Sequence, residues 1–297
     1  MITILKKIIF YINKVLKTYQ LFYYRKNKYS SFGNTAVKTK FGFWYIGNLF
    51  DKKDIASGIL HNGLIEEDET NLTLHIFSYL QKLKKIHVVD IGANTGYYTL
   101  LSSYAFATYP AHIFSFEPVK SYFECACESI KINNFNTEKI TLHNLALSNK
   151  NSEDVINISG TSSSLEKTFN NHPHATQKVT LRTLDSFADK IQPDFIKIDV
   201  EGHELRVLQG SMNTIKRNRP IIFIELIQKL NSHDFINRSY EDTLNLFNDL
   251  NYVGYLFEQN KLKRISSEFI KEGVAMYLFI DPHKHADLLN DLPYEIY

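Results

Sequence analysis

An apolar run, a glycine-rich turn and a helical pattern follow one another between residues 86 and 105. Residues 86–91 (IHVVDI) resemble a buried strand, and Gly92, Asn94 and Gly96 precede the helical spacing of the next segment. Glycines at such a turn let a ligand approach the backbone, and the helix that follows starts with unpaired N–H groups. The segment predicts a ligand site, although any α/β protein also needs small residues at a strand-to-helix turn.

Strand and helix patterns alternate from residue 86 onward. Such alternation predicts a parallel sheet covered on both faces, with ligands at the carboxyl ends of the strands. Two strand-like runs near the C-terminus, 252–265 and 273–280, have no comparable helix between them and indicate an antiparallel closing strand. A further antiparallel pair is expected at EDVINIS and KVTLRTL, joined by the loop 159–177. The core strands are expected at 86–91, 112–117, 140–147, 194–200 and 220–226, and the helices at 96–107, 119–133, 204–216 and 239–250.

Four of these otherwise apolar strands finish on an acidic residue. Within a sheet that is covered on both faces, such groups are costly unless they are paired or open into a site. One of them could cap a following helix, but four at one edge favour a binding site instead. The residues are Asp90, Glu117, Asp199 with Glu201, and Glu225.

The segment FIKIDVEGHE places charged residues on one face of a central strand. Side chains alternate along a strand, so Lys197, Asp199 and, if the strand continues, Glu201 share a face. The structural alternative is a Lys197–Asp199 ion pair that fills a polar hole. Gly202 permits a sharp turn, and His203 is then expected near the start of the next helix, close to the same pocket.

An acidic strand edge favours S-adenosylmethionine over a dinucleotide as the ligand. A pyrophosphate is repelled by carboxylates, whereas S-adenosylmethionine carries a sulfonium, an ammonium and a ribose diol. Glu117 follows Gly92 by 25 residues and is expected at the ribose, a position that also serves NAD in dehydrogenases. The turn GANTG departs from G-x-G-x-x-G because Asn94 stands where a dehydrogenase has glycine.

The first 28 residues form a basic amphipathic pattern. They contain seven Lys or Arg residues and no acid, although the whole chain carries a net charge of only +2. The pattern predicts a helix that lies on an anionic membrane surface or packs on the protein itself. Its longest uncharged stretch is too short to span a bilayer. Residues 31–85 are expected to form a less regular lead-in with a helix over 70–84.

Cysteine and histidine residues give no sign of a metal site. Cys125 and Cys127 lie two apart on a predicted helix, which suits neither a disulfide nor zinc and indicates a reducing, cytoplasmic location. His172 and His174 have metal-like spacing but no third ligand, so solvated histidines are expected. A divalent ion between Asp199 and Glu225 is conceivable, yet the sequence does not require one. No resident metal and no nucleic-acid partner are expected.

The motifs resemble those of the FkbM-type S-adenosylmethionine-dependent methyltransferases over residues 85–228. The resemblance implies an α/β, Rossmann-like class I methyltransferase fold of seven strands with an antiparallel last strand. This domain is expected over residues 71–297, after an N-terminal helical and irregular extension over residues 1–70, which match no family. The matching segments are VVDIGANTGYYTLLSS, IFSFEPVKSYFE, LHNLALSNK, GTSSSLE, VTLRTLDSF, DFIKIDVEGHELRVLQG and PIIFIEL.

The resemblance also assigns roles to individual residues. It implies that Asp199 and Glu201 flank the transferring methyl group, and Glu117 holds the ribose. His203 is a further candidate base, and Lys197 could hold Asp199 ionised or contact the substrate. Thr161–Ser164 are expected to order over the acceptor or to be a mobile loop. The methionine part of the cofactor is placed over Asp90, Gly92, Asn94 and Gly96, and the adenine near Asn144 to Ala146.

The expected reaction is O-methylation of a sugar, a glycan or a related natural product, with a small-molecule or lipid-linked glycan as the acceptor. A base near the acceptor hydroxyl must remove its proton as the new bond forms. Two alternatives stay open at this point. One is an NAD-dependent dehydrogenase, and the other is a non-catalytic, membrane-associated component of glycan assembly. The acceptor itself and the oligomeric state cannot be read from the sequence.

Overall fold

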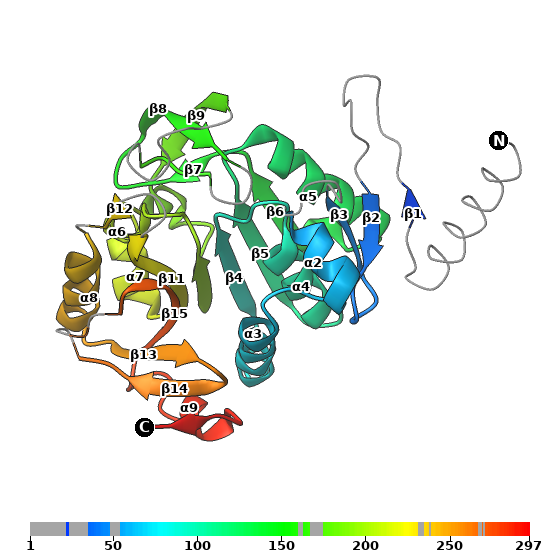
Figure 1. Cartoon of the computed structure of the whole chain (residues 1–297). Coiled ribbons are helices and arrows are strands. Elements are labelled where there is room, and N and C mark those ends of the chain that lie inside the picture. Colours follow the sequence, from blue (N-terminus) through cyan, green and yellow to red (C-terminus); the bar gives the residue numbers. More distant parts are fainter. Residues whose placement is uncertain are drawn as a thin grey trace, which may run out of the picture.

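The computed structural model of the protein describes residues 22–23, 35–47, 54–159, 163–166, 175–230, 235–237, 239–266, 269 and 271–297 (Figure 1). Within this part of the chain, a mixed ten-stranded sheet forms the centre of the fold. Its parallel core consists of β6 (Ile140–His143), β5 (Ala111–Phe116), β4 (Ile86–Ile91), β10 (Phe195–Ile198) and β11 (Ile221–Leu230), in this spatial order.

The sheet continues beyond β11 with an antiparallel strand. β15 (Gly273–Ile280) lies between β11 and β13 (Val253–Glu258) and runs antiparallel to both. The seven-stranded class I order with an antiparallel last strand is therefore confirmed. Three short strands extend the sheet beyond this prediction: β12 (Phe235–Ile236) pairs with β11, and β14 (Lys261–Arg264) and β16 (Glu295–Ile296) follow β13, beside α9 (Leu288–Asp291).

Helices cover both faces of the sheet. Val88 packs into one hydrophobic cluster with α3 (Glu67–Leu80), α4 (Tyr97–Ala105) and α5 (Lys120–Ile132). Its neighbour Val89 packs into a second cluster with α6 (Glu204–Gln209), α7 (Met212–Asn218) and α8 (Tyr240–Asp249). Because successive strand residues point to opposite faces, strands covered on both sides read as continuous apolar runs. In Figure 1 the two groups of helices lie on opposite sides of the central strands.

The helix predicted over 204–216 is two helices, because the chain breaks at Gly210 and Ser211. Gly210 lies so close to a neighbouring loop that a β-carbon there would come within 1.9 Å of the Ser148 carbonyl oxygen. Glycine also has a low helix propensity. The break lets α6 pack closely against the loop that follows the third core strand.

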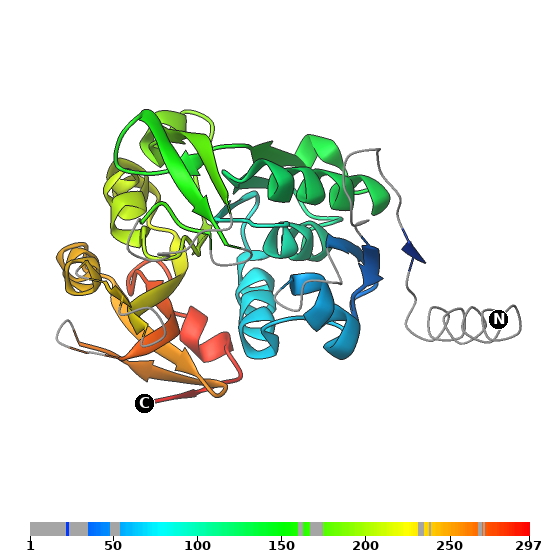
Figure 2. The same ribbon diagram turned by 45° about the horizontal axis from the view of Figure 1, so that its top comes forward.

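The strand predicted over 140–147 is likewise interrupted. It divides into β6 and β7 (Ala146–Leu147), because the Asn144 side chain donates to the backbone carbonyls of Glu117 and Pro118 at 2.9 and 3.0 Å. β7 belongs to a second sheet with β9 (Ala175–Arg182) and β8 (Ser152–Ile158), where the predicted antiparallel pair is confirmed. Figure 2 shows this sheet at the opposite end of the molecule from β14. Two 3₁₀ turns, Thr137–Lys139 and Leu184–Phe187, complete the connections.

The described part of the lead-in packs directly on the central fold. β2 (Thr35–Lys38) pairs with β1 (Phe22–Tyr23) and with β3 (Trp44–Gly47), and α2 (Ile55–Asn62) follows. The free edge of β3 is covered by α5, because the Trp44 and Ile46 N–H groups donate to Asn133 and Ser129 at 2.6 and 2.9 Å. This segment therefore shares the hydrophobic cluster of α3 and α4.

Two predictions for the N-terminal half need correction. The boundary predicted between residues 70 and 71 falls inside α3, a helix whose apolar side is buried against the sheet. The helix predicted over 1–28 does not extend to residues 22–23, which form strand β1, and the rest of that segment lies outside the described residues. Among the described residues, no helix is long and apolar enough to cross a membrane.

Candidate active site

A cavity of about 390 Å³ opens at the carboxyl ends of β4, β5 and β10 and beside the middle of β11. It is the edge at which ligands collect in open α/β sheets. Most of the residues that the sequence singled out line this cavity. They are Asp90, Gly92, Asn94, Glu117, Ala146, Lys197, Asp199, Glu201, His203 and Glu225. The prediction that a strand ends at Glu225 is wrong, because β11 continues to Leu230 and Glu225 lies within it.

Two predicted cofactor residues do not line the cavity. Gly96 packs against α5, where an added β-carbon would lie 2.8 Å from the Ala126 β-carbon. Asn144 turns away and caps the backbone of Glu117 and Pro118 through its two hydrogen bonds. Both residues shape the site through the backbone they support, rather than by lining it.

The turn GANTG is held by the protein itself. Gly92 (φ +79°) packs against β10, and a β-carbon on it would come within 1.8 Å of the Asp199 carbonyl oxygen. The N–H groups of Gly92 and Ala93 both donate to the Phe116 carbonyl, and the Asn94 N–H donates to Glu117. The glycine turn predicts that a ligand lies close to the backbone. At Gly92, however, the group that lies close is the backbone at the end of β10.

Glu117 is oriented by two backbone hydrogen bonds. Its Oε2 accepts from the Asn94 N–H at 2.8 Å and its Oε1 from the Val119 N–H at 2.7 Å. Burial raises the pKa of this carboxyl to about 7, although the two hydrogen bonds act in the opposite direction. Each carboxylate oxygen has a second lone pair, so Glu117 can still accept from a vicinal diol.

Asp90 lies in the interior wall of the same region. It is buried, and its Oδ2 accepts from the Thr99 hydroxyl at 2.7 Å, which in turn lies 2.7 Å from the Ser115 hydroxyl. Burial raises the pKa of Asp90, whereas Lys197 and Thr99 oppose that shift. A buried carboxyl that retains unused acceptor capacity suits a cationic ligand group.

Lys197 and Asp199 form an ion pair with an Nζ–Oδ2 distance of 2.9 Å. Burial disfavours the charge on Lys197, but the carboxylates of Asp199 and Glu66 outweigh it and raise the pKa of the ammonium. The ammonium also lies 4.4 Å from the ring centroid of Tyr98. The predicted pair is therefore present, and it lines the cavity rather than filling a closed hole.

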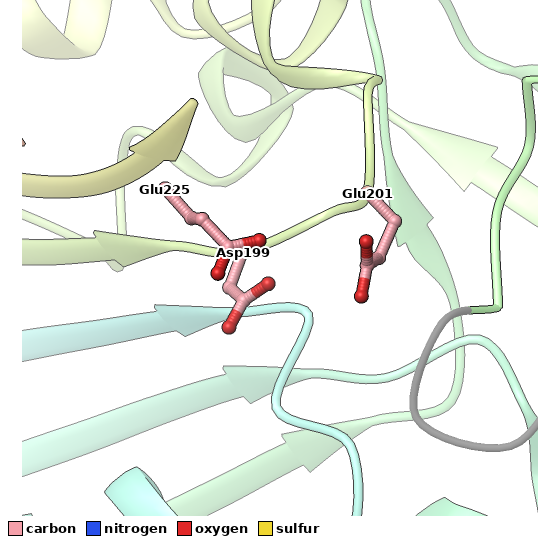
Figure 3. Close-up of side chains that lie close together, drawn as sticks. All are labelled: Asp199, Glu201 and Glu225. Atoms are coloured by element: carbon pink, nitrogen blue, oxygen red, sulfur yellow. The ribbon is translucent and has the colours of Figure 1, made fainter. Parts of the chain in front are cut away.

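The strand that carries this pair is shorter than predicted. β10 ends at Ile198, and Glu201 has φ +54°, so the strand does not continue to Glu201. Even so, Glu201 turns toward Asp199, and Figure 3 shows both carboxylates facing the same space as Glu225. One oxygen from each of the three lies within 4.8 Å of the others. Burial and the neighbouring Asp199 raise the pKa values of Glu201 and Glu225 well above the usual range.

His203 already has a partner at each ring nitrogen. Nδ1 lies 2.7 Å from Glu166 Oε1, and Nε2 lies 2.9 Å from the Ser148 hydroxyl. Ser164 donates to the Glu201 carbonyl at 2.6 Å, so residues 163–166 are tied to the turn after β10. Both ring nitrogens of His203 are thus engaged by the protein, so neither is free to contact an acceptor in this arrangement. Thr161, His172 and His174 lie outside the described residues.

Two residues of the cavity wall had no signal in the sequence. Glu66 precedes α3 in the irregular lead-in, and Tyr98 appeared as one more aromatic residue on a buried helix. The Tyr98 hydroxyl donates to Glu66 Oε2 at 2.8 Å. Only the packing of the lead-in against α4 reveals this pair, because 32 residues separate its members.

The donor set fits S-adenosylmethionine. Asp90 and Glu117 offer carboxylates for an ammonium and a ribose diol, while Ala146 and Leu147 provide apolar surface nearby. Among the described lining residues, the basic side chains are Lys197 and His203, and both are engaged by acidic partners. A pyrophosphate would meet carboxylates here, whereas a sulfonium is favoured.

A comparison with protein families gives the class of the chain. Residues 90–253, slightly more than half of the chain, match the family described as "Methyltransferase FkbM domain". A comparison with curated proteins finds no significant match.

Solved structures similar to the chain include an FkbM methyltransferase from Methylobacillus flagellatus KT. It is 18% identical, with a TM-score of 0.45, over 74% of this chain and 52% of that one, so the match spans about half the length of that protein. An O-methyltransferase from Bacillus cereus in complex with SAH is 11% identical, with a TM-score of 0.43, over 71% of this chain and 79% of that one. The match over residues 90–253 makes this chain a member of the FkbM family of S-adenosylmethionine-dependent methyltransferases, which replaces the dehydrogenase alternative.

Proposed function

We propose that this protein transfers a methyl group to a hydroxyl of a sugar, a glycan or a related natural product. The observation that carries the proposal is the convergence of Asp199, Glu201 and Glu225 within 4.8 Å, in the cavity that also contains Asp90 and Glu117. An aliphatic hydroxyl is a weak nucleophile, so its methylation needs a base at the acceptor. A ring of carboxylates supplies that base without a further cofactor.

Different residues of the chain have different roles in this reaction. Bound S-adenosylmethionine supplies an electrophilic methyl group, whose transfer to oxygen breaks the bond between carbon and sulfur and releases the acceptor's proton. Glu201 takes up that proton, because burial and the neighbouring Asp199 raise its pKa and so make its carboxylate a stronger base than an ordinary one. Lys197 pairs with Asp199 beside it and fixes the position of that carboxyl group at this end of the cavity.

Release of S-adenosylhomocysteine on glycan extracts tests the proposal. The wild type should produce it in excess EDTA, together with a 14 Da mass increase on the acceptor. Glu201→Gln and Asp199→Asn should lower turnover by about 10²-fold or more while retaining the fold. Glu124→Gln, on the exposed side of α5, is the control and should behave as wild type.

Three other outcomes would count against parts of the proposal. Normal turnover in both carboxyl variants would remove the assigned base. Complete, metal-reversible loss of activity in EDTA would require a metal-assisted reaction instead. Cofactor binding without turnover on any acceptor would favour a non-catalytic role in glycan assembly.

The place of action proposed here is the cytoplasmic face of a membrane where lipid-linked glycans are assembled. The support is the seven basic residues among residues 1–28, which have no acidic residue to balance them. These residues lie almost wholly outside the described part of the chain, so the support comes from their charge pattern.

A further inference from the structure

The lead-in forms one wall of the methyl-transfer cavity. Asp54, Ile55 and Gly58 from the start of α2, and Ile65 and Glu66 from the start of α3, line the same cavity as the residues of β4 and β10. The cavity is therefore bounded in part by a segment that precedes residues 90–253, the part that matches the FkbM family. Differences in acceptor between proteins of one fold are expected in such added segments.

One carboxylate oxygen of Glu66 is hydrogen-bonded at this wall of the cavity, and the other has no donor among the described residues. The Tyr98 hydroxyl donates to its Oε2 at 2.8 Å, and no described residue donates to its Oε1. The same Tyr98 ring lies 4.4 Å from the Lys197 ammonium, which Asp199 holds at 2.9 Å. Glu66 and Asp199 thus bracket one buried cation, and Glu66 remains exposed to the cavity.

The charges that line the cavity are strongly unbalanced. Seven of the described lining residues carry a carboxyl group. Among the same described lining residues, Lys197 is the only lysine or arginine. S-adenosylmethionine adds one net positive charge, which Asp90 and Glu117 can accommodate. Glu201 and Glu225 are left without a basic side chain of their own among the described residues, and Glu66 shares Lys197 with Asp199. The pKa values of Glu201 and Glu225 are raised well above the usual range, first by burial and then by Asp199, which shows the cost of this excess.

We propose that the acceptor carries a protonated amine beside the hydroxyl that is methylated, and that Glu66 is a residue that binds this amine. The inference rests on the proposed function, because it names the class of substrate for that site. An ammonium group would bring the missing positive charge and could donate to the free oxygen of Glu66. A phosphate or carboxylate on the same part of the acceptor would be repelled by the surrounding carboxyl groups.

A series of sugars that differ mainly in charge tests this inference. Glucosamine, glucose and glucuronate share one pyranose ring and are cationic, neutral and anionic at pH 7. Their binding to full-length protein saturated with S-adenosylhomocysteine can be compared by calorimetry and saturation-transfer NMR, in the presence of EDTA. We expect glucosamine to bind about tenfold more tightly than glucuronate, with glucose between them.

Two neighbouring glutamates supply a matched pair of variants. Glu66→Gln should reduce the preference for glucosamine over glucose by about threefold or more. Glu67→Gln should leave it unchanged, because Glu67 pairs with Lys40 on the surface and does not line the cavity. Tyr98→Phe removes the hydroxyl that directs Glu66 and serves as the second variant. The S-adenosylhomocysteine affinity of each variant, measured on the same samples, reports whether the cofactor half of the cavity is intact.

The wild-type ranking alone can overturn the inference. Equal or tighter binding of glucuronate, or no binding of any of the three sugars, would show that the cavity does not select a cationic acceptor. A preference for glucosamine that is the same in Glu66→Gln would remove the role of Glu66. An ammonium group and a divalent ion are both positively charged, so the binding series is repeated with Mg²⁺. If the cavity then binds glucuronate as tightly as glucosamine, a metal ion supplies the positive charge, and the proposal of an amine is overturned.

Failure of this inference is distinguishable from failure of the proposed function. Methylation of a neutral glycan with normal rates in Glu66→Gln would leave O-methylation standing and remove the amine. If glucosamine binds more tightly than glucuronate but no hydroxyl acceptor leads to release of S-adenosylhomocysteine, the preference for an amine stands and the proposal of O-methylation fails.

Discussion

The α-carbon of Gly92 lies against the backbone carbonyl of Asp199, so that a β-carbon on Gly92 would come within 1.8 Å of that oxygen. Contact at this point joins the end of β4 to the end of β10. It therefore fixes the distance between the glycine turn and the carboxylates proposed for methyl transfer. The motif alone assigns Gly92 to ligand binding. The structure shows that glycine is needed at this position because two strand ends pack against each other there.

Gly92→Ala should consequently destabilise the protein and distort the site. The φ of +79° disfavours a side chain, and the collision with Asp199 adds to that strain, so we expect a loss of more than about 2 kcal/mol in the free energy of unfolding. Gly42→Ala is the control, because Gly42 has φ +97° but nothing within 4 Å of an added β-carbon. Urea denaturation of both variants separates the collision from the backbone strain, and equal losses would contradict this account.

Cofactor affinity should depend on the ionisation of Glu117. Burial raises the pKa of this carboxyl to about 7, and a ribose diol donates to its ionised form, so binding must release a proton below that pH. Affinity for S-adenosylhomocysteine should therefore rise between pH 6 and 8. Glu117→Gln should bind about 2 kcal/mol more weakly at pH 8 and lose this dependence. Calorimetry at several pH values checks both, and an unchanged pH profile in the variant would exclude Glu117 as its source.

Glu204 should lower stability as the pH rises. Its Oε1 accepts from the Gly202 N–H at 2.7 Å, whereas its buried Oε2 has no hydrogen-bond partner among the described residues, and burial raises the pKa of the carboxyl to about 7. The folded state then keeps a proton that the unfolded chain loses near its ordinary pKa. Stability from this group is therefore lost as the pH rises from about 4.5 to 7.

Glu204→Gln removes this dependence because an amide does not ionise. We expect the variant to be more stable than wild type at pH 8, by about 2 kcal/mol, and nearly equal to it at pH 4.5. Urea denaturation across this pH range measures the difference, with Glu124→Gln as the exposed control. A constant difference at all pH values would mean that packing, rather than ionisation, sets the effect.

The basic N-terminal segment should bind anionic membranes reversibly. Each of its seven basic residues is worth about 1 kcal/mol near anionic lipid, and this attraction falls off within a Debye length. Full-length protein should co-sediment with anionic vesicles at low salt and be released at high salt. A variant lacking residues 1–21, which keeps β1, should bind the vesicles more weakly because it loses four of the seven basic residues. If the segment packs on the protein instead, the full-length protein stays in the supernatant and the truncation lowers its stability.

The sequence alone determined the order of strands and helices, the acids at the ends of β4, β5 and β10, and the antiparallel closing strand. These features depend on hydrophobic periodicity and turn chemistry, which are local along the chain. The run 86–91 is apolar because β4 is covered on both faces, and that pattern is readable without a structure. The family follows from the same segments.

Tertiary structure decided which of these residues contact one another and which groups form hydrogen bonds with them. Glu66 reaches the cavity through contacts with Tyr98, a residue 32 positions away, and His203 is occupied at both nitrogens by Glu166 and Ser148. The divided helix at Gly210 likewise depends on a loop that is distant in sequence. Such contacts leave no periodic signal, because the free energy that fixes them comes from packing between segments whose separation along the chain is arbitrary.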